Sequence, residues 1–173
     1  MLSDEALMLE FQTGSRDAFE ELFARYREPI YGFFRRRLES KDRADDLTQE
    51  TFLAVIRGVS RYHPRALVRT YLYGIALKLL AAERRQGKAR SEPPADAKDN
   101  ELDDALWVRR AIEKLDSSDR EILMLREYEQ LSYSEIAELL RLPVNTVRSR
   151  LFRARMALKN YLEPERRPEN AQR

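Results

Sequence analysis

A run of basic residues near the end of the sequence could bind a polyanion. Between Arg141 and Lys159 there are six basic residues and no acidic residue. If this segment is helical, the spacing i, i+3, i+4, i+7 and i+11 gives an outer stripe of Asn145, Arg148, Ser149, Phe152 and Met156. Arginine pairs bidentately with guanine, and asparagine and serine offer further hydrogen bonds to base edges. The stripe therefore predicts a helix that enters the major groove of DNA.

Further side chains of this helix would contact the DNA backbone. Arg150, Arg153 and Arg155 can neutralise phosphates, and this contribution does not depend on base sequence. Phe152 can pack on a thymine methyl group or a sugar, although a dimer contact would also explain an exposed phenylalanine. The alternative is an ordinary helical hairpin with a solvated arginine face, but such faces normally mix charges of both signs. The candidate residues for duplex binding are Asn145, Thr146, Arg148, Ser149, Arg150, Phe152, Arg153 and Arg155.

A second basic segment carries interleaved aromatic side chains. From Arg57 to Arg90 there are nine basic residues and one acidic residue. Basic tracks hold the backbone of a single strand, and aromatic rings stack on unpaired bases at about 1–3 kcal/mol each. The segment would suit an opened DNA strand, with a flipped base captured by the loop 61–67. Tyr73 is expected to be buried, because it cannot share a helix face with Tyr71. The candidates are Arg61, Tyr62, His63, Arg65, Arg69, Tyr71 and Lys78.

Several other kinds of chemistry are excluded by residue type. The sequence has no cysteine and one histidine, His63, which excludes disulfides, thiolate zinc sites and thiol nucleophiles. A Ser-His-Asp triad would need His63, which lies in a Tyr-His-Pro-Arg turn. We therefore expect no enzymatic activity, metal, cofactor or small-molecule substrate. The N-terminus is acidic, and no apolar stretch approaches the roughly 18 residues of a membrane span, so we expect a cytoplasmic protein without direct membrane insertion.

The elements that must position these residues are predicted to be helices, so the fold class is all-α. With five glycines and no long alternation of apolar and polar residues, strands are not expected. Pro29 is expected to bend or interrupt the second helix. The inner face of that helix would consist of Phe19, Leu22, Phe23, Tyr26, Ile30 and Phe33. Helices are expected in the first half over about 4–12, 15–38 (capped by Ser15 or Asp17), 42–57 (ended by Gly58) and 67–85.

A segment without helical periodicity divides the chain. Residues 91–107 carry one basic and six acidic residues, whereas residues 1–90 carry 17 basic and 13 acidic residues, and residues 108–173 carry 14 and 11. Two prolines lie in this acidic stretch. We therefore predict two small helical domains, 1–86 and 105–173, joined by a flexible acidic linker at 87–104 that proteases should cut first.

The second domain is expected to contain a helix-turn-helix. Ser118 with Glu121, and Ser132 with Glu135, have the spacing of capping boxes. After a turn at 142–143, the last helix would bury Val147, Leu151, Ala154 and Leu158 against a face formed by Ile136, Ala137 and Leu140. A helix-turn-helix places its second helix in the major groove. Four helices are expected: one over about 105–115, one that begins at 118, one over 132–140 and one over 144–162.

Three stretches of this domain resemble the −35-reading domain of extracytoplasmic-function (ECF) sigma factors of bacterial RNA polymerase. They are residues 115–126, 131–140 and 143–155. A helix-turn-helix alone could be shared with response-regulator activators. The first domain, however, contains Asp45-Asp-Leu-Thr-Gln-Glu-Thr-Phe-Leu-Ala-Val, which resembles the family's polymerase-binding helix. It also contains Thr70-Tyr-Leu-Tyr-Gly-Ile-Ala, which resembles the family's −10 segment.

The resemblance implies an alternative sigma factor that binds core RNA polymerase, recognises −35 and −10 promoter elements and promotes DNA opening. It implies that Asp45, Asp46, Gln49 and Glu50 dock on the polymerase. The implied partners are core polymerase, double-stranded and locally melted promoter DNA, and an anti-sigma factor. The acidic linker would either thread toward the polymerase channels or serve only as a tether. Two rival functions are a stand-alone repressor or activator, which would bind DNA tightly without polymerase, and a helical adaptor without DNA affinity.

The sequence departs from the family pattern in the turn and in both DNA-binding segments. Arg141 stands where the turn usually has glycine, so either this residue would need an unusual backbone or the turn would differ. Glycine is also common at the position of Asn145. The family more often has tryptophan, arginine and asparagine at the positions of Tyr71, Gly74 and Lys78. These departures concern the preferred promoter sequence rather than the role. The sequence does not reveal the promoter, the inducing signal or the identity of the anti-sigma factor.

Overall fold

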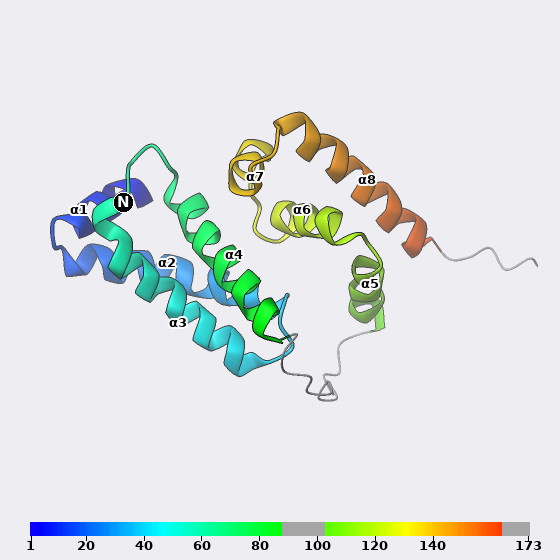
Figure 1. Ribbon diagram of the computed structural model, residues 1–173, viewed down its shortest axis with the longest axis horizontal. Coiled ribbons are helices and arrows are strands. Elements are labelled where there is room, and N and C mark those ends of the chain that lie inside the picture. The colour runs from blue at the N-terminus through cyan, green and yellow to red at the C-terminus, as the bar shows by residue number, and fades with distance from the viewer. Residues whose placement is uncertain (88–102, 164–173) are drawn as a thin grey trace, which may run out of the picture. The chain divides into compact units, whose positions relative to one another are not determined.

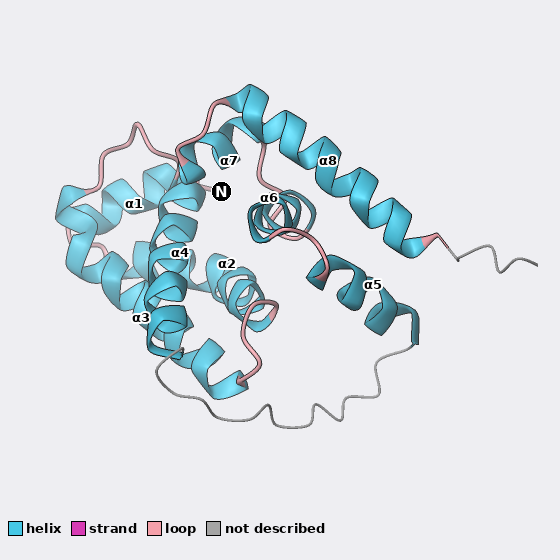
Figure 2. Cartoon of the chain, turned by 45° about the vertical axis from the view of Figure 1, so that its right-hand side comes forward, coloured by secondary structure: helices cyan, strands magenta, loops and turns pink. Residues whose placement is uncertain are grey.

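The computed structural model describes residues 1–87 and 103–163, and every regular element within these ranges is a helix (Figure 1, Figure 2). The predicted all-α class is confirmed. The helices form two compact units, with α1–α4 in the first and α5–α8 in the second. Most of the predicted linker, including its expected protease site, lies outside the described residues.

The first unit contains four helices and a short 3-10 turn. Helices α2, α3 and α4 pack on one another, and α1 packs on α2 and α4. Three of the helices begin after a serine whose hydroxyl accepts a backbone N–H: Ser3, Ser15 and Ser40. Met8, Ile30, Phe33, Phe34, Leu47, Leu72 and Leu80 form the fully buried centre. The elements are α1 (Asp4–Gln12), α2 (Arg16–Arg35), α3 (Lys41–Gly58), η1 (Val59–Arg61) and α4 (Val68–Gly87).

The predicted inner face of α2 faces the interior. Leu22, Tyr26, Ile30 and Phe33 are buried, and Phe19 and Phe23 are half-buried. The two half-buried rings belong to a row of aromatic contacts. Ring centroids lie 4.9 Å apart for Phe11 and Phe19, 6.3 Å for Phe19 and Phe23, and 4.8 Å for Phe23 and Phe52. Aromatic packing therefore joins α1, α2 and α3.

Helix α2 continues through Pro29, so the proline does not interrupt it, and the bend expected as the alternative stays a prediction. Proline cannot donate to the carbonyl of Arg25 and costs roughly 3 kcal/mol inside a helix. The next turn, however, places Ile30, Phe33 and Phe34 in the core, each 0% exposed. Full burial of such a side chain contributes about 1.5–3 kcal/mol. The burial of three large side chains outweighs the cost of one exposed proline.

The second unit contains α5 (Asp103–Glu113), α6 (Ser117–Glu127), α7 (Tyr133–Leu140) and α8 (Val144–Leu162). The capping box of α7 is confirmed. The Glu135 N–H donates to Ser132 Oγ at 3.1 Å, and the Ser132 N–H donates to Glu135 Oε2 at 2.6 Å. Both groups of this box are therefore satisfied within one turn.

The capping box predicted from Ser118 and Glu121 is wrong. Helix α6 begins earlier, after Asp116, whose carboxylate accepts the Ser118 hydroxyl at 2.6 Å and the Ser118 N–H at 3.1 Å. These hydrogen bonds from Ser118 stabilise the ionised form and hold the pKa of Asp116 below its usual range. An aspartate two positions before the serine therefore takes the cap.

The turn between α7 and α8 depends on a left-handed residue. Arg141 has φ 55° and ψ 48°, which confirms the unusual backbone expected at this position. The Leu142 N–H donates to the Ala137 carbonyl at 2.9 Å and closes the end of α7. Glycine adopts this conformation without the steric cost that a Cβ adds.

Replacing Arg141 with glycine should stabilise the second unit by roughly 0.5–1 kcal/mol. The left-handed conformation costs an L-residue about 1–2 kcal/mol, and glycine avoids this cost. Glycine also lowers the stability by about 0.4–1 kcal/mol, because it increases the conformational entropy of the unfolded chain. Urea unfolding of the full chain, followed by circular dichroism, measures the change. Asn160→Gly, inside α8, is the control and should instead destabilise the protein. An Arg141→Gly variant no more stable than the parent would contradict the strain assigned to this turn.

Candidate nucleic-acid interface

Helix α8 divides into a buried and an outward face, as predicted. Val147, Leu151 and Ala154 are at most 1% exposed, and Leu158 is half-buried. These residues pack on α6 and α7, where Ile136 and Ala137 are also buried, whereas Leu140 is half-buried. The outward stripe is formed by Asn145, Arg148, Ser149, Phe152 and Met156, all of them exposed.

The outward stripe begins with a small polar cluster. Arg148 Nη1 donates to Asn145 Oδ1 at 3.0 Å, and Ser149 Oγ donates to the Thr146 carbonyl at 3.1 Å. Farther along, Phe152 exposes 68% of its surface. The first two turns of α8 therefore present amide, guanidinium and hydroxyl groups beside an apolar ring, the set of groups that contacts base edges and thymine methyl groups.

Two of the predicted phosphate contacts are engaged inside the protein. Arg153 makes two hydrogen bonds of 2.6 Å to Asp119, and Arg155 makes one of 2.7 Å to Glu127. Asp119 and Glu127 lie near opposite ends of α6, about 12 Å apart along its axis. Two neighbouring arginines of α8 thus reach in opposite directions along α6. The two ion pairs oppose rotation of α8 about its own axis.

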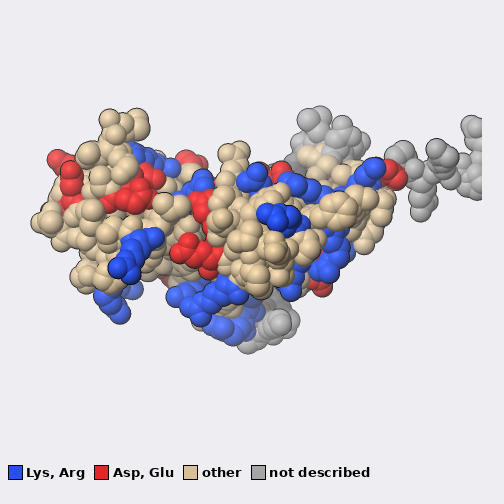
Figure 3. All heavy atoms as spheres, turned by 90° about the horizontal axis from the view of Figure 1, so that it is seen from above, with Lys and Arg blue, Asp and Glu red and all other residues tan. Residues whose placement is uncertain are grey.

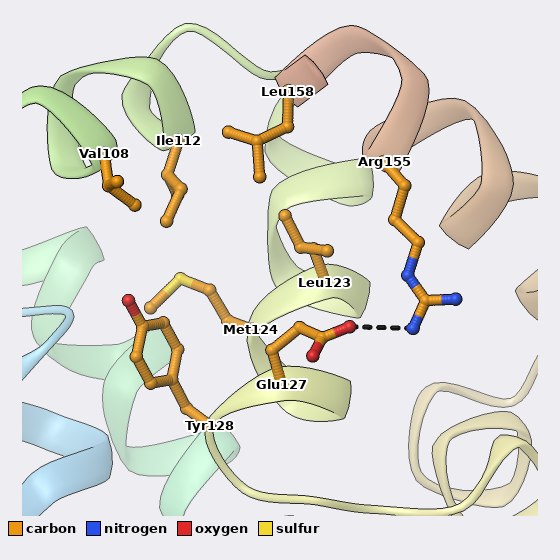
Figure 4. A pocket seen from close by; sticks show the side chains of 8 residues that line it. All are labelled: Val108, Ile112, Leu123, Met124, Glu127, Tyr128, Arg155 and Leu158. Atoms are coloured by element: carbon orange, nitrogen blue, oxygen red, sulfur yellow. Dashed lines mark hydrogen bonds and ion pairs between the residues drawn. The ribbon is translucent and has the colours of Figure 1, made fainter. Parts of the chain in front are cut away.

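Arg155 lies beside an apolar pocket of about 350 Å³ between α5, α6 and α8 (Figure 4). Figure 4 shows its side chain next to that of Glu127, with the ion pair at one side of the pocket. The apolar side chains of the wall are Val108, Ile112, Leu123, Met124 and Leu158, and Tyr128 completes it. Arg155 therefore lies on the flank of α8 that faces α6 rather than in the outward stripe.

The face that carries α8 is predominantly basic. In the view of Figure 3, Lys and Arg side chains spread over the second unit with few acidic side chains among them. Arg148 and Arg141 are exposed, and Arg150 is half-buried. The absence of acidic residues between Arg141 and Lys159 accounts for this surface. Such a surface attracts a polyanion.

The second basic segment occupies α4 and the loop before it. Arg61, His63, Arg65 and Lys78 are exposed, and Arg69 and Tyr71 are half-buried. Tyr73 is 3% exposed and packs against Phe33 with ring centroids 5.7 Å apart, which confirms its predicted burial.

Tyr62 lies in the interior of the loop instead of on its surface. Its side chain is 4% exposed, its hydroxyl donates to the Ala66 carbonyl, and its ring meets that of Tyr71 edge-on at 5.3 Å. Burial raises the pKa of Tyr62 above its usual value. In this conformation Tyr62 shapes the loop and is not available for stacking on a base, because the hydrophobic gain and the hydrogen bond both favour the buried position.

Two side chains of helix α1 hold this loop through three hydrogen bonds that the sequence did not reveal. Gln12 Nε2 donates to the carbonyls of Val59 and Tyr62, both at 2.7 Å. Glu5 Oε1 accepts the Val68 N–H at 3.2 Å, at the start of α4. The partners are 47–63 residues apart in sequence, so no local pattern could indicate them.

Tyr71 is placed by the end of α3. A Cβ added to Gly58 would lie 2.9 Å from the Tyr71 hydroxyl oxygen. Burial raises the pKa of Tyr71 above its usual value. The absence of a side chain at Gly58 thus sets how closely the ring approaches α3.

Helix α3 presents an acidic outer face that also carries apolar side chains. Asp45, Asp46, Gln49 and Glu50 are all exposed, and Gln49 Nε2 donates to Asp45 Oδ2 at 3.1 Å. Leu53 and Ile56, on the next turns, are each 45% exposed. Single exposed apolar side chains are common, but neighbouring ones that are bordered by polar residues are found at protein-binding surfaces.

One member of this acidic face has a structural partner. Asp46 accepts a hydrogen bond from Arg43 at 3.1 Å, and Arg43 also binds Glu83 of α4 at 2.6 Å. Asp46 thus takes part in the attachment of α3 to α4, whereas the described contacts of Asp45 and Gln49 lie within α3.

Metal sites and membrane spans are absent from the described part of the chain. Within residues 1–87 and 103–163, no group of three or more His, Cys, Asp and Glu side chains is arranged to hold a metal ion. None of the helices in these ranges is long and apolar enough to cross a membrane.

Two family models match the chain. Residues 22–90 match sigma-70 region 2, and residues 105–158 match sigma-70, region 4. The first match covers most of α2 together with α3 and α4, and the second covers α5 to most of α8.

Individual proteins are similar over nearly the whole chain. The RNA polymerase sigma-H factor of Pseudomonas aeruginosa is 33% identical, over 93% of this chain and 94% of its own. The ECF RNA polymerase sigma-E factor of Escherichia coli is 32% identical, over 94% of this chain and 96% of its own. Among solved structures, CnrH in complex with the cytosolic domain of CnrY superposes with a TM-score of 0.73. It is 26% identical, over 92% of this chain and 96% of that chain.

Proposed function

The chain belongs to the ECF sigma factors of the sigma-70 family, and we propose that its two helical units divide promoter recognition between them. As an alternative sigma factor it serves RNA polymerase in promoter recognition and transcription initiation. Members of the family are not enzymes, since the polymerase performs the chemistry. In our proposal α8 reads the −35 element, and α4 with its preceding loop holds the opened −10 element.

The outward stripe of α8 is the observation that carries the −35 assignment. Asn145, Arg148, Ser149 and Phe152 are exposed side by side at the start of the second helix of a helix-turn-helix. The N-terminal residues of such a helix reach base edges in the major groove. Thr146 is half-buried next to Asn145 in the sequence, and its backbone carbonyl accepts a hydrogen bond from Ser149 Oγ.

The −10 assignment is supported by exposed polar and basic side chains close in sequence to one half-buried aromatic ring. Arg61, His63 and Arg65 of the loop are exposed, and Lys78 is exposed on α4. Tyr71, which is half-buried and follows these residues in the sequence, is the ring that we propose for base stacking. Arg69, on the same helix, would contact the DNA backbone. Stacking and phosphate contacts can together offset the lost base-pair stacking, about 1.4 kcal/mol per step.

The acidic face of α3 is proposed as the docking site for core polymerase. Asp45, Asp46, Gln49 and Glu50 supply its charge and hydrogen bonds, and the apolar Leu53 and Ile56 extend it. We also propose an anti-sigma factor as a partner, because the similar protein CnrH was solved with the cytosolic domain of CnrY. We place the protein in the cytoplasm, with the polymerase.

Transcription with purified core polymerase tests the whole proposal. The full chain should direct start sites on a library of genomic fragments that core polymerase alone does not use. Mapping these start sites should reveal a shared pair of upstream elements near −35 and −10. Core polymerase that starts at the same sites without the chain, or tight site-specific DNA binding by the chain without polymerase, would contradict it.

Replacing Gly58 with alanine should impair promoter opening through Tyr71. The new Cβ would lie 2.9 Å from the Tyr71 hydroxyl oxygen and push the ring away from its present position. A base stacked on a ring contributes about 1–3 kcal/mol, so partial loss should reduce opening roughly threefold to tenfold. Permanganate reactivity of thymines in the opened region measures the effect.

A second substitution separates this effect from a general loss of stability. Tyr71→Phe removes the hydroxyl that the new methyl group would meet, so the double variant Gly58→Ala with Tyr71→Phe should open promoters like Tyr71→Phe alone. If the double variant stays as weak as Gly58→Ala, the steric link between these residues is not the cause.

A further inference from the structure

The ion pair between Asp119 and Arg153 differs in geometry and burial from the ion pair between Glu127 and Arg155. Nε and Nη2 of Arg153 donate to Oδ2 and Oδ1 of Asp119, both at 2.6 Å. The Asp119 side chain is 7% exposed and that of Arg153 is 63% exposed. By contrast, Arg155 and Glu127 share one hydrogen bond and are both about half exposed. A buried carboxylate therefore fixes one edge of the Arg153 guanidinium while the rest of the side chain faces solvent.

The N–H groups of Arg153 that Asp119 does not use form a second fork. A guanidinium carries five N–H donors in one plane, and Asp119 accepts two of them. The edge formed by Nη1 and Nη2 lies in the plane that Asp119 sets. Two parallel N–H donors match O6 and N7 of guanine. Because the plane is fixed before binding, less side-chain freedom is lost when a base is bound.

The same pair is poorly suited to a phosphate. A carboxylate at hydrogen-bond distance cancels most of the attraction that the guanidinium exerts on a nearby anion. Hydrogen bonding to a base edge needs no net charge. The pair therefore favours base recognition by Arg153 over the phosphate contact that the sequence suggested. Arg153 also lies one helical turn beyond Ser149, at the edge of the outward stripe.

We propose that Asp119 is a specificity-determining positioning residue, which holds Arg153 so that its outer edge reads a guanine in the duplex promoter element. This rests on the proposed function, in which α8 reads that element. Asp119 touches no base. It acts from the first turn of α6, where the helix N-terminus also favours a carboxylate.

Asp119→Asn is the direct test, performed with the full chain bound to core polymerase. Affinities are measured on a duplex with a promoter mapped by transcription and on a duplex with its upstream element scrambled. The ratio of the two affinities should fall about tenfold, because the amide no longer fixes the guanidinium. Affinity for the scrambled duplex should stay the same or rise, since the charge of Arg153 is no longer cancelled. Glu127→Gln, the matched change at the neighbouring pair, should keep the ratio of the parent.

Two further measurements distinguish positioning from a structural tie. Arg153→Lys keeps a cation beside Asp119 but lacks the fork of two parallel N–H donors. The ratio of cognate to scrambled affinity should therefore fall, whereas the midpoint of unfolding should stay the same. Replacing each guanine of the element by 7-deazaguanine removes its N7 acceptor. One such replacement should weaken DNA binding by the parent protein. It should not weaken DNA binding by the Asp119→Asn variant any further.

Each contrary outcome has a distinct meaning. If Asp119→Asn weakens both duplexes in parallel and keeps the ratio, or if Arg153→Lys keeps the ratio, the pair only ties α6 to α8 and the proposal is overturned. If the parent protein itself does not distinguish the two duplexes, the assignment of α8 as the reading helix fails, and the role of Asp119 fails with it.

Discussion

Replacing Asp45, Gln49 and Glu50 together by lysine should weaken binding to core RNA polymerase about 100-fold. The three side chains are exposed on one face of α3, and like charges brought together at an interface cost several kcal/mol. The substitution spares Asp46, which contacts Arg43 and thereby the attachment of α3 to α4. The fold should therefore remain intact. Titration of fluorescently labelled chain with core polymerase measures the affinity, and circular dichroism checks the helices.

A control variant separates docking from net charge. Glu10→Lys with Glu28→Lys changes the charge by nearly as much, on exposed positions of α1 and α2. It should bind polymerase nearly as the parent does. Undiminished binding by the triple variant, or an equal loss in the control, would remove the assignment of this α3 face.

Replacing Arg148 with alanine should cost roughly 1–3 kcal/mol of binding to the cognate −35 duplex and relax base preference at one or two positions. Arg148 is exposed in the second turn of α8, with Nη1 3.0 Å from Asn145 Oδ1. Removing one base-reading side chain near the start of a recognition helix has an effect of this size. Equilibrium binding of the holoenzyme to cognate and scrambled duplexes gives both the affinity and the preference.

Arg155→Ala is the comparison on the same helix. Because Glu127 holds this arginine at 2.7 Å, away from the outward stripe, its loss should leave the ratio of cognate to scrambled affinity unchanged. Any weakening should be similar on both duplexes. If both variants lose affinity equally on cognate and scrambled DNA, α8 binds only phosphates and the base-reading role of Arg148 is wrong.

The spacing of residues in the sequence predicted the helices well because their apolar faces are periodic. The burial of Val147, Leu151 and Ala154 follows directly from that period, and so does the outward position of Arg148. The capping box of Ser132 was predictable for the same reason, since both partners lie within four residues. The same spacing at Ser118 and Glu121 did not give a capping box, because the neighbouring Asp116 caps α6 instead.

Tertiary contacts decided the features that the sequence did not predict. Helix α2 passes Pro29 because the core on the far side of the proline outweighs one missing hydrogen bond. Arg153 has the sequence position of a phosphate contact, but Asp119, 34 residues earlier, binds it. Tyr62 has the pattern of an exposed stacking ring, but its loop folds over it. Asp119 stands at no spacing that a sequence pattern could indicate, and the burial of Tyr62 depends on how a non-helical loop folds.

The attachment of α1 to the loop before α4 has a consequence for local unfolding. The helix is nine residues long, and isolated helices shorter than roughly 12–15 residues are only marginally stable in water. Its order therefore depends on Leu7 and Met8, which are buried in the core. When α1 detaches, Gln12 releases the carbonyls of Val59 and Tyr62. Amide hydrogens of η1 and its loop should then exchange with those of α1 as one cooperative unit. Docking of the first helix therefore contributes to the free energy that holds the loop in place, beside the loop's own contacts through Tyr62.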